Sequence, residues 1–162
     1  MSAAASAPSA AGPRIPLENV LFWALRLGLG GLLIWSGVAK LGDPAKFASE
    51  IANYQLLPSV SPFMAVTLPP VEVVLGLALV VGRVPWVRAA ALAATLVLGV
   101  FTLAVTTVVA RGISVECGCF GTGSSLVTMW TVARDVAFVA AAVAVYVLAS
   151  RRSVASSRHA LR

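Results

Sequence analysis

The chain has 162 residues, of which 59% are hydrophobic and only 11% are charged, and its mean hydropathy is +0.94. An ordinary soluble domain carries roughly 25% charged residues, so this composition excludes a typical soluble enzyme and indicates an integral membrane protein. The net charge is +6. Because the basic residues are scattered at the ends of apolar segments, we expect contact with an anionic lipid surface and no binding of nucleic acid.

Residues 1–16 are mainly Ala, Ser, Pro and Gly, with a single basic residue, Arg14. Such a segment has too little apolar surface to fold against a core, so we expect a disordered cytoplasmic tail. The apolar run that follows is long enough to span a bilayer, and no small-residue cleavage site comes after it. We therefore interpret this run as a retained first helix rather than a signal peptide.

Four apolar windows have about the 20 residues that cross the hydrocarbon core of a bilayer. They cover residues 17–38, 63–81, 86–110 and 126–149. Because lipid offers no hydrogen bonds to the backbone, segments of this kind must be helices. The predicted fold class is an all-α integral membrane protein, a four-transmembrane-helix bundle over residues 17–149 that is followed by a basic cytoplasmic tail at 150–162.

A short helix is predicted between the first two spans. Asp43 is a suitable N-cap, and Pro44 suits the first helical position. Phe47, Ile51 and Tyr54 then fall at i, i+4 and i+7 on one apolar face, as in a helix that lies flat at the membrane interface. Its role is left open between a plain interfacial lid and a part of the site on the same side of the membrane.

The distribution of Lys and Arg predicts the orientation, because cytoplasmic loops keep the excess of positive charge. One side holds seven basic residues and the other holds three. We therefore predict a multi-pass protein of the cell (inner or plasma) membrane with both termini in the cytoplasm and the 112–125 loop outside it. The seven are Arg14, Arg83, Arg88, Arg151, Arg152, Arg158 and Arg162, and the three are Lys40, Lys46 and Arg111.

Four ionisable residues lie inside the predicted spans: Arg26, Glu72, Arg134 and Asp135. At about 1.5 Å per residue, three of them lie about 14 Å from a helix end, near the bilayer midplane. A lone charge there costs from about 3 to more than 10 kcal/mol. We therefore expect Arg26 and Arg134 to neutralise Glu72 and Asp135 inside the bundle. This intramembrane charge cluster either fixes the bundle or forms a site for a proton, a quinone or a substrate.

Small residues indicate where the helices approach one another. Gly30 and Gly37 share one face of the first span with Arg26, and Gly76 shares a face of the second span with Glu72. The third span carries a polar and small stripe at Thr95, Gly99, Thr102 and Thr106. Its hydroxyls can face the bundle interior or bond back to their own helix.

Cys117 and Cys119 are the only cysteines, and they lie one glycine apart in the loop between the last two spans. A disulfide between them closes a small strained ring, and strained bridges exchange readily. We predict a redox pair outside the cytoplasm, where disulfides persist. Two structural thiols, a static disulfide and half of a metal site between subunits are the alternatives. Zinc needs four ligands and the one histidine, His159, is predicted on the other side, so no metal site is expected.

Several short segments occur in an order that resembles a known family. The segments are Lys40-Leu-Gly-Asp-Pro44, Tyr54-Gln-Leu-Leu-Pro58, Leu68-Pro-Pro-Val-Glu72, Cys117-Gly-Cys-Phe-Gly121 and Arg134-Asp135. Over roughly residues 17–148 the chain resembles the MauE family of methylamine utilisation proteins, within the DoxX-like group of four-helix membrane proteins. The first and third segments are shared with DoxX-like proteins generally, whereas the cysteine segment is typical of MauE.

The resemblance implies an accessory membrane protein for the maturation of methylamine dehydrogenase, whose small subunit is disulfide-rich. It also implies a thioredoxin-like partner outside the cytoplasm. A membrane oxidase that works alone relays electrons between two cysteine pairs, and this chain has one pair, so a partner must supply the second. We predict thiol–disulfide exchange in which electrons pass to a quinone or come from another carrier; the direction of electron flow stays open.

Two other functions are compatible with the sequence. The chain can be a non-enzymatic DoxX-like subunit that assembles with other membrane proteins through its glycine-bearing faces. It can also be a small proton-coupled transporter in which Glu72 or Asp135 binds the proton or cation. Whether it forms a homo-oligomer is left open by the sequence.

Overall fold

The computed structural model describes residues 17–56, 58–113 and 127–160, with the backbone alone for residues 154–160. These residues form helices and connecting turns, and no strand occurs among them. The helices are α1 (Leu17–Leu41), α2 (Pro44–Asn53), a 3-10 turn (Pro58–Val60), α3 (Ser61–Val81), α4 (Val84–Ala110) and α5 (Met129–Ala160). In the described part, α1, α3, α4 and α5 are long and apolar enough to cross a membrane. The predicted fold class is thereby confirmed.

The last helix differs from the predicted span at its C-terminal end. α5 does not stop at Ala149 but continues to Ala160, through residues that we expected to form a tail. Its first turns beyond Ala149 are held against α1. Arg152 donates a hydrogen bond of 2.7 Å to Asn19 Oδ1, and its guanidinium lies 3.9 Å from the centroid of the Phe22 ring. These contacts extend the helical packing beyond the apolar sequence that defined the predicted span.

The short helix between the first two spans is present as α2. Asp43 caps it, because Asp43 Oδ1 accepts a hydrogen bond of 2.9 Å from the backbone N–H of Lys46, and Pro44 occupies the first turn. Phe47 and Tyr54, on the predicted apolar face, are both buried. The prediction of a capped amphipathic helix at this position is confirmed.

Glycines bring α1 and α3 into close contact. A Cβ added at Gly76 would lie 2.7 Å from the carbonyl oxygen of Gly30, and one added at Gly37 would lie 2.7 Å from that of Pro69. No side chain fits at such distances, so these positions require glycine. The close approach that the sequence predicted for these faces is confirmed.

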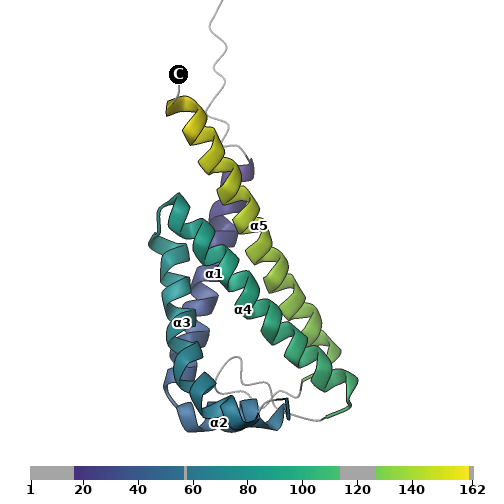
Figure 1. Ribbon diagram of the computed structural model, residues 1–162. Coiled ribbons are helices and arrows are strands. Elements are labelled where there is room, and N and C mark those ends of the chain that lie inside the picture. Colours follow the sequence, from purple (N-terminus) through teal and green to yellow (C-terminus); the bar gives the residue numbers. More distant parts are fainter. Residues whose placement is uncertain (1–16, 57, 114–126, 161–162) are drawn as a thin grey trace, which may run out of the picture.

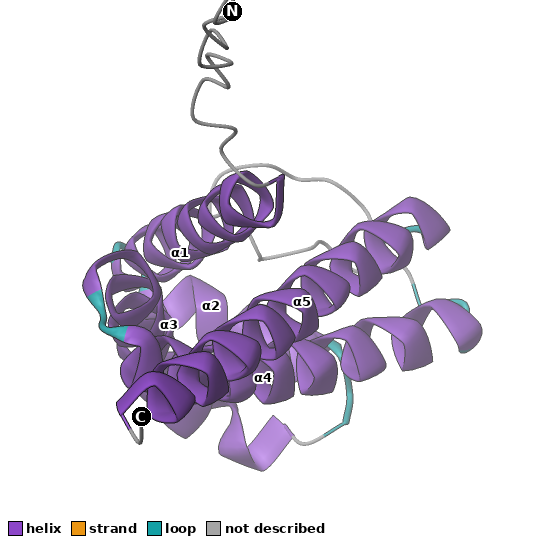
Figure 2. Ribbon diagram, turned by 90° about the horizontal axis from the view of Figure 1, so that it is seen from above, coloured by secondary structure: helices purple, strands orange, loops and turns teal. Residues whose placement is uncertain are grey.

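The helices form two pairs, α1 with α3 and α4 with α5, which converge at one end and diverge toward the other (Figure 1). α2 lies across the divergent end, and in the view from above it lies beneath the two pairs (Figure 2). The convergent end is filled by small and medium-sized side chains from all four long helices, with Phe22, Leu79, Ala91 and Val145 among the most buried. The divergent end leaves internal space.

Candidate functional site

The two cysteines lie outside the described residues, but both ends of the segment that carries them are described. Ile113, four residues before Cys117, and Val127, eight residues after Cys119, pack in the same apolar cluster at the divergent end. The centre of this cluster includes the buried Tyr54 ring, which follows α2. The described residues on either side of the cysteine segment therefore belong to the apolar cluster that contains Tyr54, the residue directly after α2.

Glu72 is paired with Lys40 and not with an arginine. Lys40 Nζ lies 2.6 Å from Glu72 Oε1 and 2.7 Å from Oε2, and it donates a third hydrogen bond of 3.0 Å to Ser36 Oγ. The two charged side chains are only 5% and 7% exposed. The Ser36 hydroxyl in turn donates to Glu72 Oε2 at 3.2 Å. Both charges are therefore neutralised and hydrogen-bonded where α1 meets α3.

Arg26 contacts no carboxylate among the described residues, and the prediction that it neutralises Glu72 or Asp135 is wrong. Its guanidinium donates to the carbonyl oxygens of Leu79, of Val80 at 3.1 Å and of Gly82 at 2.6 Å. These carbonyls belong to the C-terminal end of α3, where backbone acceptors lack helical partners and carry partial negative charge. Arg26 therefore caps α3.

The antiparallel register of α1 and α3 explains the error. Gly37 lies beside Pro69 and Glu72, whereas Gly30 lies beside Gly76 and Val80. Ser36, which touches Glu72, is ten residues from Arg26 along α1, which amounts to about 15 Å of helix. Arg26 and Glu72, which we expected at the same depth, are therefore at different levels of the bundle.

Arg134 and Asp135 pair with each other within α5, whereas we expected the charges of the spans to pair across helices. Arg134 Nε and its terminal nitrogen lie 3.2 Å and 3.1 Å from Asp135 Oδ1. The Asp135 side chain is 7% exposed and that of Arg134 is 28% exposed. Asp135 Oδ2 is buried and has no hydrogen-bond partner among the described residues. A buried oxygen of this kind is costly unless something else occupies its lone pairs.

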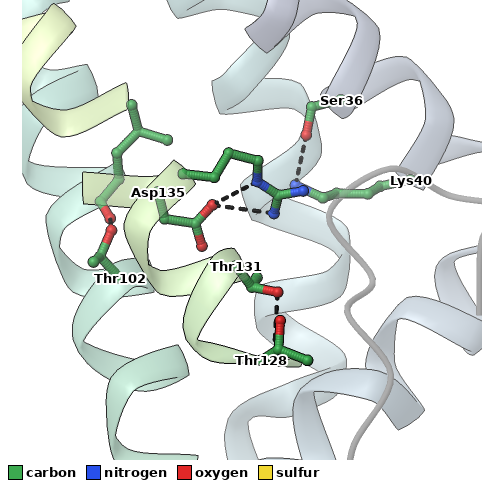
Figure 3. A network of polar contacts seen from close by, with 8 residues as sticks. Ser36, Lys40, Thr102, Thr128, Thr131 and Asp135 are labelled. Carbon is green, nitrogen blue, oxygen red and sulfur yellow. Dashed lines mark hydrogen bonds and ion pairs between the residues drawn. The ribbon is translucent and has the colours of Figure 1, made fainter. Parts of the chain in front are cut away.

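A small cavity with a mainly apolar lining is bordered by both members of the Lys40–Glu72 pair and by Asp135. Its volume is about 40 Å³, and its polar lining includes Ser36, Lys40, Glu72 and Asp135. Figure 3 shows Lys40 extending from α1 and Asp135 projecting from α5 in this region. The lining thus includes Ser36, Lys40, Glu72 and Asp135, but it does not include Arg26.

The threonine stripe of α4 bonds back to its own helix, which was one of the two predicted alternatives. The hydroxyls of Thr95, Thr102 and Thr106 donate to the carbonyl oxygens of Ala91, Leu98 and Thr102 at 2.7–2.8 Å. Thr102 is buried and lines the polar cavity, and Figure 3 shows the hydrogen bond of its hydroxyl within α4. The hydroxyl proton of Thr102 is therefore already used in a hydrogen bond.

A larger apolar chamber adjoins the polar cavity. It has a volume of about 370 Å³ and is enclosed by α2, α3 and α4 and the segment after α2. The two spaces share Leu68, Val97 and Phe101 in their walls. The other lining residues of the chamber are Phe47, Ile51, Tyr54, Leu56, Met64, Leu96, Val100 and Ala104.

Lys40 is the site residue that sequence reasoning missed. It was counted as a charge of the loop after the first span, yet α1 continues through it and its ammonium is buried. Two signals were available. Ser36 lies one helical turn before Lys40 on the same face, and a long lysine stem at a helix end can carry its charge along apolar surface to a partner.

The described residues contain no group of three or more His, Cys, Asp or Glu side chains placed to hold one metal ion. The buried carboxylates are instead engaged with basic side chains of α1 and α5. In this part of the chain the polar groups are therefore arranged for ion pairing and hydrogen bonding.

Comparison with known proteins agrees with the motifs. Residues 18–148 match the family described as Methylamine utilisation protein MauE. The chain is 33% identical over 132 residues to the methylamine utilization protein MauE of Paracoccus denitrificans, an alignment that covers 80% of this chain and 70% of that protein. No solved structure matches the chain significantly. A family match over most of the chain and this relative establish that the protein is a member of the MauE family.

Proposed function

We propose that this protein supports thiol–disulfide exchange outside the cytoplasm through Cys117 and Cys119, and so promotes maturation of disulfide-containing proteins in methylamine utilisation. The observation that carries the proposal is the Cys-Gly-Cys segment in a chain of this family. Ile113 and Val127, the described residues nearest to that segment, pack in the apolar cluster of Tyr54, Val105 and Val108. The proposal places this cluster at the extracytoplasmic face of the cell membrane, in accord with the positive charge near the two termini.

The exchange has a simple balance. A thiolate of a thioredoxin-like partner attacks one sulfur of the Cys117–Cys119 disulfide and forms a mixed disulfide, and the second partner thiol then resolves it. The partner loses two electrons and two protons, and Cys117 and Cys119 gain them as two thiols. The partner is a soluble or membrane-tethered protein with its own cysteine pair, since this chain contains only one pair.

The test is to trap the mixed disulfide. Exchange is reversible, so in a Cys119→Ser or Cys117→Ser variant the remaining thiolate can attack the disulfide of the oxidised partner. The neighbouring cysteine that would complete this reverse exchange is missing, so we expect one of the two variants to accumulate a covalent adduct with the partner. The adduct is seen on non-reducing gels of membranes prepared with acid quenching. The double Cys117→Ser, Cys119→Ser variant is the matched control and forms no adduct.

Two results would contradict the proposal. One is the failure of both single variants to form an adduct while the remaining thiol still reacts with maleimide. The other is unchanged maturation of the client protein in cells that carry the double variant. The second result would favour a non-enzymatic assembly role for the bundle.

A further inference from the structure

We propose that the apolar chamber between α2, α3 and α4 binds an isoprenoid quinone and its hydroquinone, with one ring oxygen directed to the polar cavity at Asp135. The inference rests on the proposed function, because the quinone is the acceptor for the electrons that Cys117 and Cys119 take from the partner protein. The binding site itself is built from described residues only.

The size and lining of the chamber suit an apolar ring and the start of a tail. Its volume of about 370 Å³ lies within the range of about 300–1,000 Å³ that is typical of ligand pockets. Nearly all its lining side chains are aliphatic or aromatic, and the ring of Tyr54 packs edge-on against that of Phe101 at 6.3 Å between centroids. Leu96 and Val100, on the same wall, are exposed on the surface of a membrane-spanning helix. A lipid-soluble ligand can therefore reach the chamber from the bilayer.

The adjoining polar cavity argues for a ligand with a hydrogen-bonding oxygen on an apolar body. Its volume of about 40 Å³ exceeds the roughly 10–15 Å³ that one water molecule requires, so it has room for a small polar group. A phospholipid places its polar oxygens in the headgroup region and has only an acyl chain to offer a buried cavity, whereas a quinone carries its oxygens on the ring.

Asp135 is the group available to that oxygen. Lys40 uses its three protons on Ser36 and on both oxygens of Glu72, and the Thr102 proton is bonded to Leu98 O. Asp135 Oδ2 is buried without a hydrogen-bond partner in the described chain. Because Asp135 is ionised in its pair with Arg134, this oxygen can accept a hydrogen bond from a hydroquinone hydroxyl.

The redox step balances without another reactant. Two electrons leave the thiols of Cys117 and Cys119 as their S–S bond forms, and two protons are released. A quinone in the chamber would take up these two electrons and two protons and become a hydroquinone, and the Asp135 carboxylate, ionised in its pair with Arg134, would accept a hydrogen bond from one of the new hydroxyls. Tyr54 and Phe101 line the chamber and also pack with Ile113 or Val127 in one cluster, so the chamber borders the ends of the cysteine segment.

The test uses the full-length protein in quinone-free phosphatidylcholine nanodiscs, labelled with a photoreactive azido-ubiquinone. We expect labelling on peptides of α2, α3 or α4 that line the chamber, and we expect decylubiquinone to compete with it. Decanol, which has the same tail length without the ring, is the competitor that represents an acyl chain. Equal competition by decanol would overturn the proposal, because the chamber would then be a lipid site.

Two variants of α4 give the matched comparison. Ala104 lines the chamber, so the ring in Ala104→Phe fills it and we expect decylubiquinone to bind at least about tenfold more weakly, or about 1.4 kcal/mol. Ala89 is exposed on the same helix and lines neither space, so Ala89→Phe keeps wild-type binding. Equal affinity in the two variants would contradict the assigned site.

Asp135→Asn and the cysteine variants separate the two proposals. We expect Asp135→Asn to slow quinone reduction by the dithiol form more than it weakens quinone binding. The double cysteine variant keeps wild-type quinone binding, because its binding residues are unchanged. Quinone binding without any mixed disulfide would refute the exchange function and leave the site standing. A mixed disulfide without quinone binding would refute the site alone.

Discussion

Lys40 and Glu72 show how a single contact can determine whether charged residues are tolerated inside this membrane domain. Each side chain is more than nine-tenths buried, and each makes several hydrogen bonds to the other or to Ser36. A buried charge is costly when unpaired, whereas a fully hydrogen-bonded pair offsets much of that cost. The pair is therefore more sensitive to the loss of one partner than to the loss of both.

The first prediction concerns this asymmetry. Glu72→Gln should lower the free energy of unfolding by about 3–5 kcal/mol, because it leaves the Lys40 ammonium buried without a counter-charge. The double variant Lys40→Met, Glu72→Met should recover most of that loss. The measurement is unfolding in mixed micelles with increasing SDS. Glu18→Gln, at an exposed position of α1, is the control, and a double variant no more stable than Glu72→Gln would contradict the argument.

At the scale of helices, α1 and α3 act as one unit that is held at both ends. Near one end of α3, Arg26 donates to three carbonyl oxygens that have no partners within the helix. Nearer the other end, the Lys40–Glu72 pair links the same two helices. Between these points the glycines permit backbone contact, so the polar contacts and the close packing support one register.

The second prediction tests that register. Gly37→Ala should destabilise the protein by about 1–3 kcal/mol, because its new methyl group would overlap the Pro69 carbonyl and force the helices apart. Gly28→Ala should change stability by no more than about 1 kcal/mol, since it meets no atom within 4 Å and only changes helix propensity. Both are read from SDS-induced unfolding. Equal effects of the two substitutions would show that the close contact between Gly37 and Pro69 does not contribute to stability.

At the scale of the whole molecule, the two helix pairs give the bundle a packed end and an open end. Small side chains such as Ala90, Ala91 and Ala94 allow the pairs to meet at one end. At the other end, which α2 crosses, the pairs diverge (Figure 1). Residues of this part of the bundle line the polar cavity and the apolar chamber. The chemistry proposed for the protein is thus confined to the end that carries the cysteine segment.

The third prediction concerns the orientation of these ends. In intact, pre-reduced cells a membrane-impermeant maleimide should label Cys117 and Cys119 without permeabilisation, because the charge distribution places their loop outside the cytoplasm. An Arg151→Cys variant in a background without other cysteines should react only after permeabilisation. Labelling in the reverse pattern would invert the topology and remove the basis for extracytoplasmic exchange.

Much of the architecture was accessible from local sequence. Hydropathy and length predicted the membrane-spanning helices, Asp43 and Pro44 predicted the start of α2, and the Gly30, Gly37 and Gly76 faces predicted where α1 meets α3. These features were predictable because each depends on neighbours one helical turn away or on the bilayer thickness. The Arg134–Asp135 pair is also local, since its members are adjacent, but we had expected these charges to pair across helices.

The partners of Arg26 and Glu72 depended on the tertiary structure. The register of the antiparallel helices α1 and α3 determines which residues become partners. Ten residues along α1 separate Arg26 from the level of Glu72, which amounts to about 15 Å. The divergence of the helix pairs, and hence the chamber, likewise arises from how four surfaces pack at once. Residue types and their spacing could specify which faces are apolar, small or charged, but only the packed bundle sets which of those faces meet and where space remains between them.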